Sequence, residues 1–354
     1  MPSAFTKKAV VLLSHGTPAA LSLGAVRKFL LGFLDDERVI GLPALLRKLL
    51  LFGVILPFRA RKSLAMYEKI WLPAGSPLAI YTESLRQKLE ARLGGGIPVF
   101  TAMHAGEPSV AAVLREIVAR GIAEIVVIPQ FPQDSEAGRS AAVERFLALS
   151  RKILPAGMVV KIVPAFFAAR GYVGVVAKNL PPALSRGVAR KFVFSFHGVP
   201  VKSIFRGVEK AAAGLVVATK PRPRCDPGSR DFSEALCAGC VGREKCYRRQ
   251  CYLSAAAIAD FAGIDRNNVV VSFQSRFGHG KWLAPETRDV LRAKPNRDNV
   301  VLCSPGFTAD CVETLWELRG LGAGTLVACA NDADEFADFL AECVVAGGLP
   351  PEKN

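Results

Sequence analysis

The chain has 354 residues, of which 51% are apolar, and it carries a formal net charge of +15. This length exceeds the roughly 250–300 residues at which one hydrophobic core stops growing, so we expect two domains, and the apolar content excludes an intrinsically disordered chain. The charge favours anionic partners, such as nucleic acid, an acidic membrane surface or a carboxylated small molecule.

No apolar run in the sequence reaches the roughly 18–20 residues that a membrane-spanning helix needs. The apolar run after Lys7 and Lys8 is short and leads directly into a polar loop, which is unlike a secretory signal. We therefore expect a cytoplasmic protein. In that compartment the nine cysteines would be reduced thiols or metal ligands rather than disulfides.

Short apolar runs alternate with helical stretches in chain order. The first part has expected strands at 9–13, 98–103, 124–132 and 158–166, and expected helices at 21–34, 110–120 and 141–153. The second part has expected strands at 192–196, 268–275 and 299–305, and expected helices at 252–262, 285–293 and 310–319. This alternation predicts βαβ units with parallel strands, in an α/β protein.

One signature occurs twice, almost half the chain apart. VVLLSHGTP (10–18) and FVFSFHGVP (192–200) are each an apolar strand that ends in His-Gly-x-Pro. The repeat predicts two similar doubly wound, Rossmann-like halves with a cleft between them, because loops at the carboxyl ends of parallel strands line the ligand site. We place the halves at 1–165 and 166–354, with a boundary helix within 165–190.

Three motifs of the second half make the prediction more specific. SFHGVP (195–200), SFQSRFGHGKWLAPET (272–287) and SPGFTADCVETLWEL (304–318) together resemble the ferrochelatase family. The first half resembles it more loosely, through GTP after the first strand, FLDDERVIGLP (33–43), Gly75-Ser76-Pro77 and PQFPQDS (129–135). The resemblance implies a chelatase-like fold and an enzyme that inserts ferrous iron into protoporphyrin IX to form protohaem, the last step of haem synthesis.

Metal insertion needs a proton acceptor and oxygen ligands, because two pyrrole N–H protons must leave as a divalent cation enters. His197 suits the first role, since the pKa of histidine is close to neutral pH. The resemblance marks Glu313 as catalytic on the other face of the porphyrin, and His197 and Glu313 as the residues that handle the substrate iron. Asp310, Glu313 and Glu317 have the spacing of one helix face, so Asp310 and Glu317 are predicted to support an acidic path. An acidic helix start that only complements the helix dipole is the alternative.

Other residues near these motifs have smaller predicted roles. Trp282 and Ser195 are expected in the porphyrin pocket, with a plain core position as the alternative for Trp282. His15 departs from the family pattern and is expected to be a structural echo of His197 rather than a second base. His104 and His279 are expected to be solvated or supporting residues, and Cys311 is given no ligand role.

The segment LPALLRKLLLFGVILPF (42–58) is apolar on almost every side when drawn as a helix, with basic residues at its margins. The resemblance implies an apolar lip over the porphyrin pocket; a core helix is the alternative. Basic flanks beside an apolar surface also suit peripheral contact with the inner face of a membrane that contains anionic lipid.

A cysteine-rich insert separates this chain from ordinary members of the family. It reads CDPGSRDFSEALCAGCVGREKCYRRQC. Its five cysteines exceed the four ligand positions of a zinc or iron–sulfur site. We predict a [2Fe–2S] cluster, with structural zinc as the alternative. The predicted ligands are Cys225, Cys237, Cys240 and Cys246, with Cys251 in reserve because cluster-free relatives also have a Gln-Cys pair there.

Two alternatives to a protoporphyrin enzyme remain open. The nearer is a ferrochelatase that uses coproporphyrin III. The more remote is a haem- or nucleic-acid-binding regulator, suggested by the charge and by basic runs such as KPRPRC (220–225). The sequence shows no basic groove interleaved with aromatic residues, so we expect no nucleic-acid partner; steep salt dependence of binding would indicate one.

Overall fold

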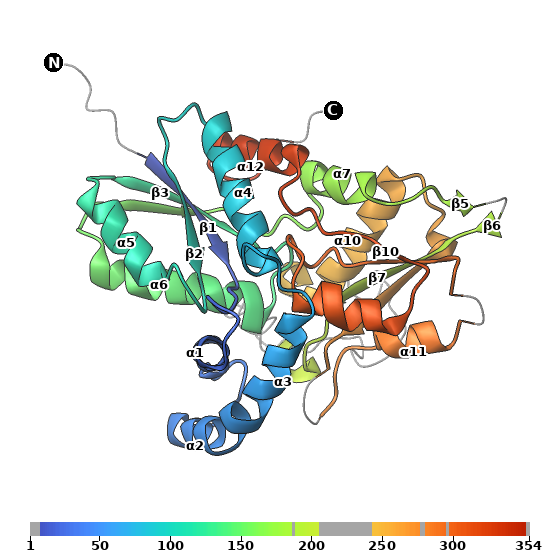
Figure 1. Cartoon of the computed structure of the whole chain (residues 1–354). Coiled ribbons are helices and arrows are strands. Elements are labelled where there is room, and N and C mark those ends of the chain that lie inside the picture. The colour runs from blue at the N-terminus through green and yellow to red at the C-terminus, as the bar shows by residue number, and fades with distance from the viewer. Residues whose placement is uncertain (1–7, 186–187, 205–242, 277–279, 295–296, 352–354) are drawn as a thin grey trace, which may run out of the picture.

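The computed structural model describes residues 8–185, 188–204, 243–276, 280–294 and 297–351. Two parallel sheets of four strands each form its centre (Figure 1). The first sheet has the order β2-β1-β3-β4, and the second has the order β10-β9-β7-β8. The prediction of an α/β protein with two doubly wound halves is confirmed.

The elements before the boundary predicted at residue 165 build the first half. They are β1 (Lys8–Ser14), α1 (Leu23–Leu34), α2 (Ala44–Leu50), the π-helix η1 (Leu51–Ile55), α3 (Leu56–Glu68), α4 (Pro77–Arg92), β2 (Val99–Met103), α5 (Val110–Ala119), β3 (Glu124–Pro129), the π-helix η2 (Glu136–Ser140), α6 (Ala141–Ile153) and β4 (Val159–Ile162). All four strands are parallel, as their apolar sequences predict.

The second half repeats the arrangement. It contains α7 (Arg170–Lys178), a two-stranded ribbon of β5 (Leu184–Ser185) and β6 (Val188–Ala189), β7 (Lys191–His197), the 3₁₀ turn η3 (Arg243–Lys245), α10 (Tyr247–Phe261), the 3₁₀ turn η4 (Arg266–Asn268), β8 (Val269–Gln274), α11 (Thr287–Arg292), β9 (Val300–Cys303), the π-helix η5 (Glu313–Leu318), the 3₁₀ turn η6 (Arg319–Leu321), β10 (Thr325–Leu326) and α12 (Asp334–Ala346). The helix expected at 310–319 is instead a π-helix followed by a 3₁₀ turn.

Alternate side chains of each central strand enter different cores. Val11 and Leu13 of β1 pack under α5 and α6, whereas Val10 and Leu12 face the opposite side. That opposite side is shared: its cluster also contains Phe194 of β7 and side chains of α4, α7, α10 and α12. The two sheets therefore bury one face each in the same core, and the boundary at residue 165 stays a prediction.

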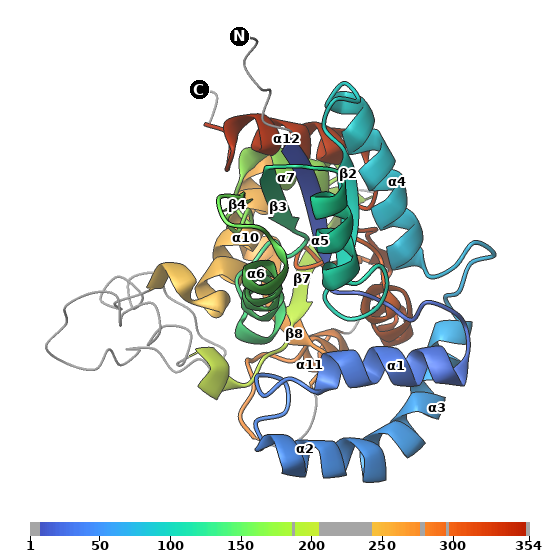
Figure 2. The same cartoon turned by 90° about the vertical axis from the view of Figure 1, so that its left-hand side faces the viewer.

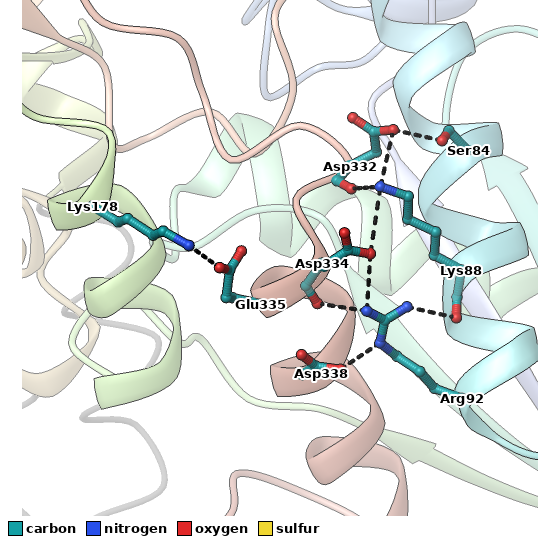
Figure 3. A network of polar contacts seen from close by, with 8 residues as sticks. All are labelled: Ser84, Lys88, Arg92, Lys178, Asp332, Asp334, Glu335 and Asp338. Atoms are coloured by element: carbon teal, nitrogen blue, oxygen red, sulfur yellow. Dashed lines mark hydrogen bonds and ion pairs between the residues drawn. The ribbon is translucent and has the colours of Figure 1, made fainter.

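Helix α12 returns from the end of the chain to the first half, where it lies beside α4 (Figure 1). Polar contacts join the two helices at their surface (Figure 3). Arg92 of α4 pairs with Asp334 at 3.0 Å and with Asp338, and Lys88 donates to the backbone oxygen of Asp332 at 2.6 Å. On the other side of α12, Lys178 of α7 pairs with its Glu335.

Helices α1, α2 and α3 form an arm below the sheets (Figure 2). Buried residues of α1 and α3, such as Phe29 and Ala60, share a separate small core. The outer side of the arm is apolar and exposed. This apolar patch consists of Leu45, Leu46, Leu49, Phe52, Val54 and Phe58, of which Phe58 is 75% exposed.

Candidate active site

The two repeated histidines lie at the carboxyl ends of corresponding strands. Strand β1 lies between β2 and β3, and β7 lies between β9 and β8. Each is an inner strand, so neighbours fix its end on both sides. His15 follows β1 and His197 ends β7, and the charge of His197 acts on His15. The repeat therefore brings two imidazoles from different halves toward one site.

His197 presents one ring nitrogen to its surroundings. Its side chain is exposed, and Nδ1 lies 2.7 Å from the carbonyl oxygen of Gly198. A carbonyl only accepts, so Nδ1 carries the hydrogen and Nε2 keeps its lone pair. The His197 carbonyl in turn accepts a hydrogen bond of 2.9 Å from the hydroxyl of Tyr247. The ring is thus held in the tautomer that a base or a metal ligand requires.

Ser195 lies inside the second sheet, two residues before His197. It is fully buried, and its hydroxyl lies 2.5 Å from Gln274 Oε1 and 2.7 Å from the hydroxyl of Thr287. The backbone carbonyl oxygen of Gln274 also accepts a hydrogen bond, from the backbone amide of Gly198 at 2.7 Å. Ser195 thereby supports the strand end from within, and its predicted place in the pocket wall stays a prediction.

Trp282 packs beside the loop that follows His197. It pairs with Pro200 in an antiparallel bridge, and a Cβ on Gly198 would lie 3.5 Å from its ring. The indole is half-buried, and among the described residues its N–H has no hydrogen-bond partner. The indole nitrogen itself is buried, so its N–H is not open to a ligand in this arrangement.

The π-helix η5 carries two carboxylates that interact with one another. Glu313 and Glu317 are half-buried, and Glu317 also feels the charge of His197. Burial, followed by repulsion from Glu313, raises the pKa of Glu317 above its ordinary value. The hydroxyl of Ser275 donates to Glu317 and opposes this rise. A carboxyl that keeps its proton more readily than usual is suited to passing protons.

Asp310 lies apart from this pair. It precedes η5 and is only 4% exposed. Its two carboxylate oxygens accept from the Thr314 hydroxyl at 2.9 Å and from the Asn331 side-chain amide at 2.8 Å. These bonds anchor the start of the π-helix. The expected row of three carboxylates on one regular helix face is not formed, because Asp310 precedes the helix and η5 is a π-helix; the role of Asp310 in an acidic path stays a prediction.

The arm adds residues that the sequence analysis missed. Arg59 of α3 interacts with both Glu313 and Glu317. Tyr67, also of α3, is buried beside Glu313, and burial followed by that charge raises the pKa of its phenol strongly. In the sequence, Arg59 is only one of the basic residues that flank the leucine-rich segment 42–58. Its distance from η5 along the chain left no sequence signal for this contact.

His15 is enclosed by aromatic rings. The ring centroids of Phe33 and Phe131 lie 4.6 and 6.2 Å away, and that of His104 lies at 6.3 Å. Burial, followed by the charges of His104 and His197, lowers the pKa of His15 to about 3. Burial also lowers the pKa of His104, which is 4% exposed, to about 4. His104 is therefore a buried supporting residue, whereas His279 lies outside the described residues.

A cavity of about 230 Å³ lies between residues of the two halves, beside the loop that follows His197. Asp134, Glu136 and Glu144 line it from the first half, and Val199 and Tyr247 are among its residues from the second. His197, Glu313 and Glu317 are not among the residues that line it, so the expected ligand cleft stays a prediction.

The described part of the insert contains two of its five cysteines. Cys246 is 9% exposed and caps the start of α10, and Cys251 is fully buried within that helix. Cys225, Cys237 and Cys240 lie outside the described residues. No group of three or more metal-ligating side chains occurs among the residues that are described.

Comparisons with known proteins show the family of this chain. Residues 7–347 match the family model described as Ferrochelatase. A ferrochelatase of Bdellovibrio bacteriovorus is 32% identical over 96% of this chain and 98% of its own length, and one of Opitutus terrae is 34% identical over 95% and 96%. A solved structure, SirB from Bacillus subtilis with Fe3+, covers 96% of this chain and 95% of its own, with a TM-score of 0.49 and 11% identity, which is too weak a likeness to support an argument.

The sequence matches define an enzyme of the metal–porphyrin chelatase class. The chain belongs to the ferrochelatase family. A porphyrin and ferrous iron are accordingly its substrates.

Proposed function

We propose that this enzyme inserts ferrous iron into protoporphyrin IX, with His197 and the Glu313–Glu317 pair acting on the ring and the metal. The observation that carries the proposal is the arrangement of these three side chains: the exposed imidazole of His197 interacts electrostatically with Glu317, and Glu317 interacts with Glu313 on the same π-helix. Proton acceptors and iron ligands are the groups that this reaction needs.

His197 accepts a pyrrole proton at Nε2. Its Nδ1–H stays on the Gly198 carbonyl, which stabilises the imidazolium that forms. Trp282, beside that loop, offers its indole to the edge of the porphyrin. We propose that the ring lies against the carboxyl end of β7.

Glu313 binds the entering cation through a carboxylate oxygen, and Glu317 holds or releases a proton. The raised pKa of Glu317 suits this exchange, because the group can change its charge state when a cation arrives nearby. Arg59 balances the charge of the pair while no cation is present. The π-helix keeps both carboxylates on one short segment, since π-helices recur at functional sites for such placements.

An anaerobic metallation assay tests this proposal. Wild-type protein, ferrous iron and protoporphyrin IX are mixed, and the loss of free-porphyrin fluorescence is followed. Glu313→Gln and His197→Ala are each expected to lower the rate by about 10²–10⁴-fold, the usual contribution of one acid–base group. Glu335→Gln, an exposed carboxylate paired with Lys178 on α12, is the matched control and should metallate at the wild-type rate.

The outcomes separate the substrates as well as the residues. Metallation of coproporphyrin III without protoporphyrin IX would correct the substrate and keep the mechanism. Unchanged rates in Glu313→Gln and His197→Ala would contradict the assigned roles. Failure of the wild type with both porphyrins would refute the proposed reaction.

We further propose that the insert holds a [2Fe–2S] cluster through Cys225, Cys237, Cys240 and Cys246. Cys246 fits this role because it lies at the start of α10, where the helix dipole favours a thiolate. Cys251 does not fit as well: burial raises the pKa of its thiol, so it keeps its proton. A cluster would provide either redox or iron sensing or structural bracing of the insert.

Absorption spectroscopy of the purified protein tests the cluster. Cys240→Ser should lose the visible absorption of the cluster, whereas Cys251→Ser should retain it. An unchanged spectrum in Cys240→Ser would contradict the assignment. A colourless wild-type protein that releases zinc to a chelator would favour the zinc alternative.

The apolar patch of the arm supports a third proposal, contact with the inner face of a membrane. Lys48, Arg61 and Lys62 are exposed beside the patch, which suits anionic lipid. No helix within the described ranges is long and apolar enough to cross a bilayer. Phe58→Ser should weaken sedimentation with anionic vesicles, and Val345→Ser, an 82% exposed apolar residue of α12, should leave it unchanged. Equal sedimentation of both variants with the wild type would refute the contact.

A further inference from the structure

Asn331 lies in the loop that joins β10 to α12, and its backbone has an uncommon conformation. Its φ is 49°, in the left-handed region that residues other than glycine rarely adopt, although asparagine tolerates it better than most. Within the described ranges, Ser275 is the only other residue besides glycine with a positive φ, at 62°. The hydroxyl of Ser275 donates to Glu317 of the acidic pair. Backbone of this kind concentrates at functional sites, and the contacts of Asn331 lead to the same pair.

Three hydrogen bonds join Asn331 to the residues that precede η5. Its backbone amide donates to the Thr308 carbonyl at 2.7 Å, and its side-chain oxygen accepts from the Asp310 amide at 2.7 Å. Its side-chain nitrogen donates to the Asp310 carboxylate at 2.8 Å. A backbone amide only donates and a carboxylate accepts, so each end of the asparagine side chain meets the partner that it requires. This double contact holds Asp310 in one orientation.

Asp310 connects this contact to the π-helix. Its other carboxylate oxygen accepts from the Thr314 hydroxyl at 2.9 Å, and the same hydroxyl accepts from the Cys311 amide at 3.0 Å. Asp310 is 4% exposed and Thr314 is 2% exposed, so these bonds lie away from water, where they are electrostatically stronger. Thr314 directly follows Glu313 in η5. The start of the π-helix is therefore fixed from the loop that contains Asn331.

The loop that contains Asn331 is itself held by the first half. Asp332, the next residue, accepts from the Ser84 hydroxyl at 2.5 Å through its carboxylate and from Lys88 at 2.6 Å through its backbone oxygen (Figure 3). Ser84 and Lys88 both belong to α4. A helix of the first half thus supports the loop that orients a carboxylate segment of the second.

We infer that Asn331 is a positioning residue of the metallation reaction and that it holds Glu313 in place through Asp310 and Thr314. The inference rests on the proposed function, because it assumes that Glu313 binds the entering cation. Asn331 acts only through these neighbours, so its loss should affect the chemical step rather than porphyrin binding. A catalytic group that is displaced by about 1 Å can cost about 10²-fold in rate.

Asn331→Gly in the anaerobic metallation assay tests the inference. Glycine adopts a positive φ without strain, so this variant removes the side chain and preserves the conformation of the loop. We expect kcat to fall by about 10–100-fold, with KM for protoporphyrin IX within about twofold of the wild type. Asn179→Gly is the matched control, because the Asn179 side-chain amide donates to the same loop at the Cys329 carbonyl, 3.2 Å away, rather than to Asp310. It should metallate at the wild-type rate.

Further measurements separate positioning from a general loss of structure. Asp310→Ala should also lower kcat, and adding Asn331→Gly to it should cost less than about a further twofold, because both changes break the same connection. Amide hydrogen exchange in η5 should become faster in Asn331→Gly, while exchange in β7 stays at the wild-type level. Asn331→Asp keeps the size of the side chain and places a carboxylate against Asp310. It should lower kcat in the same way, and it replaces the glycine variant if that variant folds poorly.

The inference is wrong if Asn331→Gly keeps the wild-type kcat, if it changes KM alone, or if the effects of the two substitutions multiply in the double variant. With a wild-type enzyme that metallates normally, each of these results leaves the proposed function intact. A wild-type enzyme that metallates neither protoporphyrin IX nor coproporphyrin III would refute the proposed function instead. Unchanged exchange of the η5 amides would overturn the role of Asn331 independently of catalysis.

Discussion

Gly16→Ala is the most informative single change to the scaffold of the site. Gly16 has a φ of 109°, in the region that favours glycine, and a Cβ there would lie 1.6 Å from the carbonyl oxygen of Ala105. The conformation alone costs a side chain about 1–3 kcal/mol. The clash is with backbone, so the β1 and β2 loops must separate and lose the two hydrogen bonds that join them, at about 1 kcal/mol each. We expect a total loss of about 3–5 kcal/mol.

Urea unfolding measures this loss, and Gly24→Ala provides the control. A Cβ on Gly24 meets nothing within 4 Å, and its φ is not positive, so that variant should be neutral or gain at most about 1 kcal/mol. A Gly16→Ala protein within about 1 kcal/mol of the wild type would refute the reasoning, since the loop would then have tolerated the displacement.

Three further predictions concern charge and packing. For Glu317, whose pKa is raised, the protonated carboxyl contributes stability that is complete below the ordinary pKa of 4.5 and is lost as the pH rises through the folded value; Glu317→Gln should remove this dependence in urea titrations between acid and neutral pH. Phe146→Ala, which empties a fully buried site under the first sheet, should cost about 3–5 kcal/mol in the same assay, and a loss below about 1 kcal/mol would mean that the site collapses. Arg92→Gln should lower the melting temperature at low salt, and a difference that persists at high salt would show that screened ion pairs are not its cause.

The sequence predicted the sheets better than the helices. Short apolar runs in the sequence correctly indicated seven of the strands, because buried parallel strands are apolar on both faces. Helix α4 was missed, although Ser76 and Pro77 are a typical helix start and the Ser76 hydroxyl accepts from the Ala79 amide at 3.3 Å. Its mixed composition hides a buried face that only α12 and the sheet define.

The site was predicted in its residue types and not in its local geometry. His197 followed from the repeat and the motifs, and Glu313 followed from the resemblance. The spacing of Asp310, Glu313 and Glu317 predicted a regular helix, whereas the structure has a π-helix that begins at Glu313. Backbone hydrogen-bond register has no simple residue signature, and contacts such as Arg59 with Glu317 depend on the fold of the arm.

The shared core also governs how the chain can fold during synthesis. Val10 and Leu12 of β1 belong to the same buried cluster as Phe336 and Leu340 of α12, which the ribosome makes much later than β1. The first half therefore cannot complete its interior while it is still alone outside the exit tunnel. Contacts this distant in sequence slow folding and leave apolar strands uncovered for longer. We expect the newly made first half to depend on chaperones until α12 has been synthesised and can pack against it.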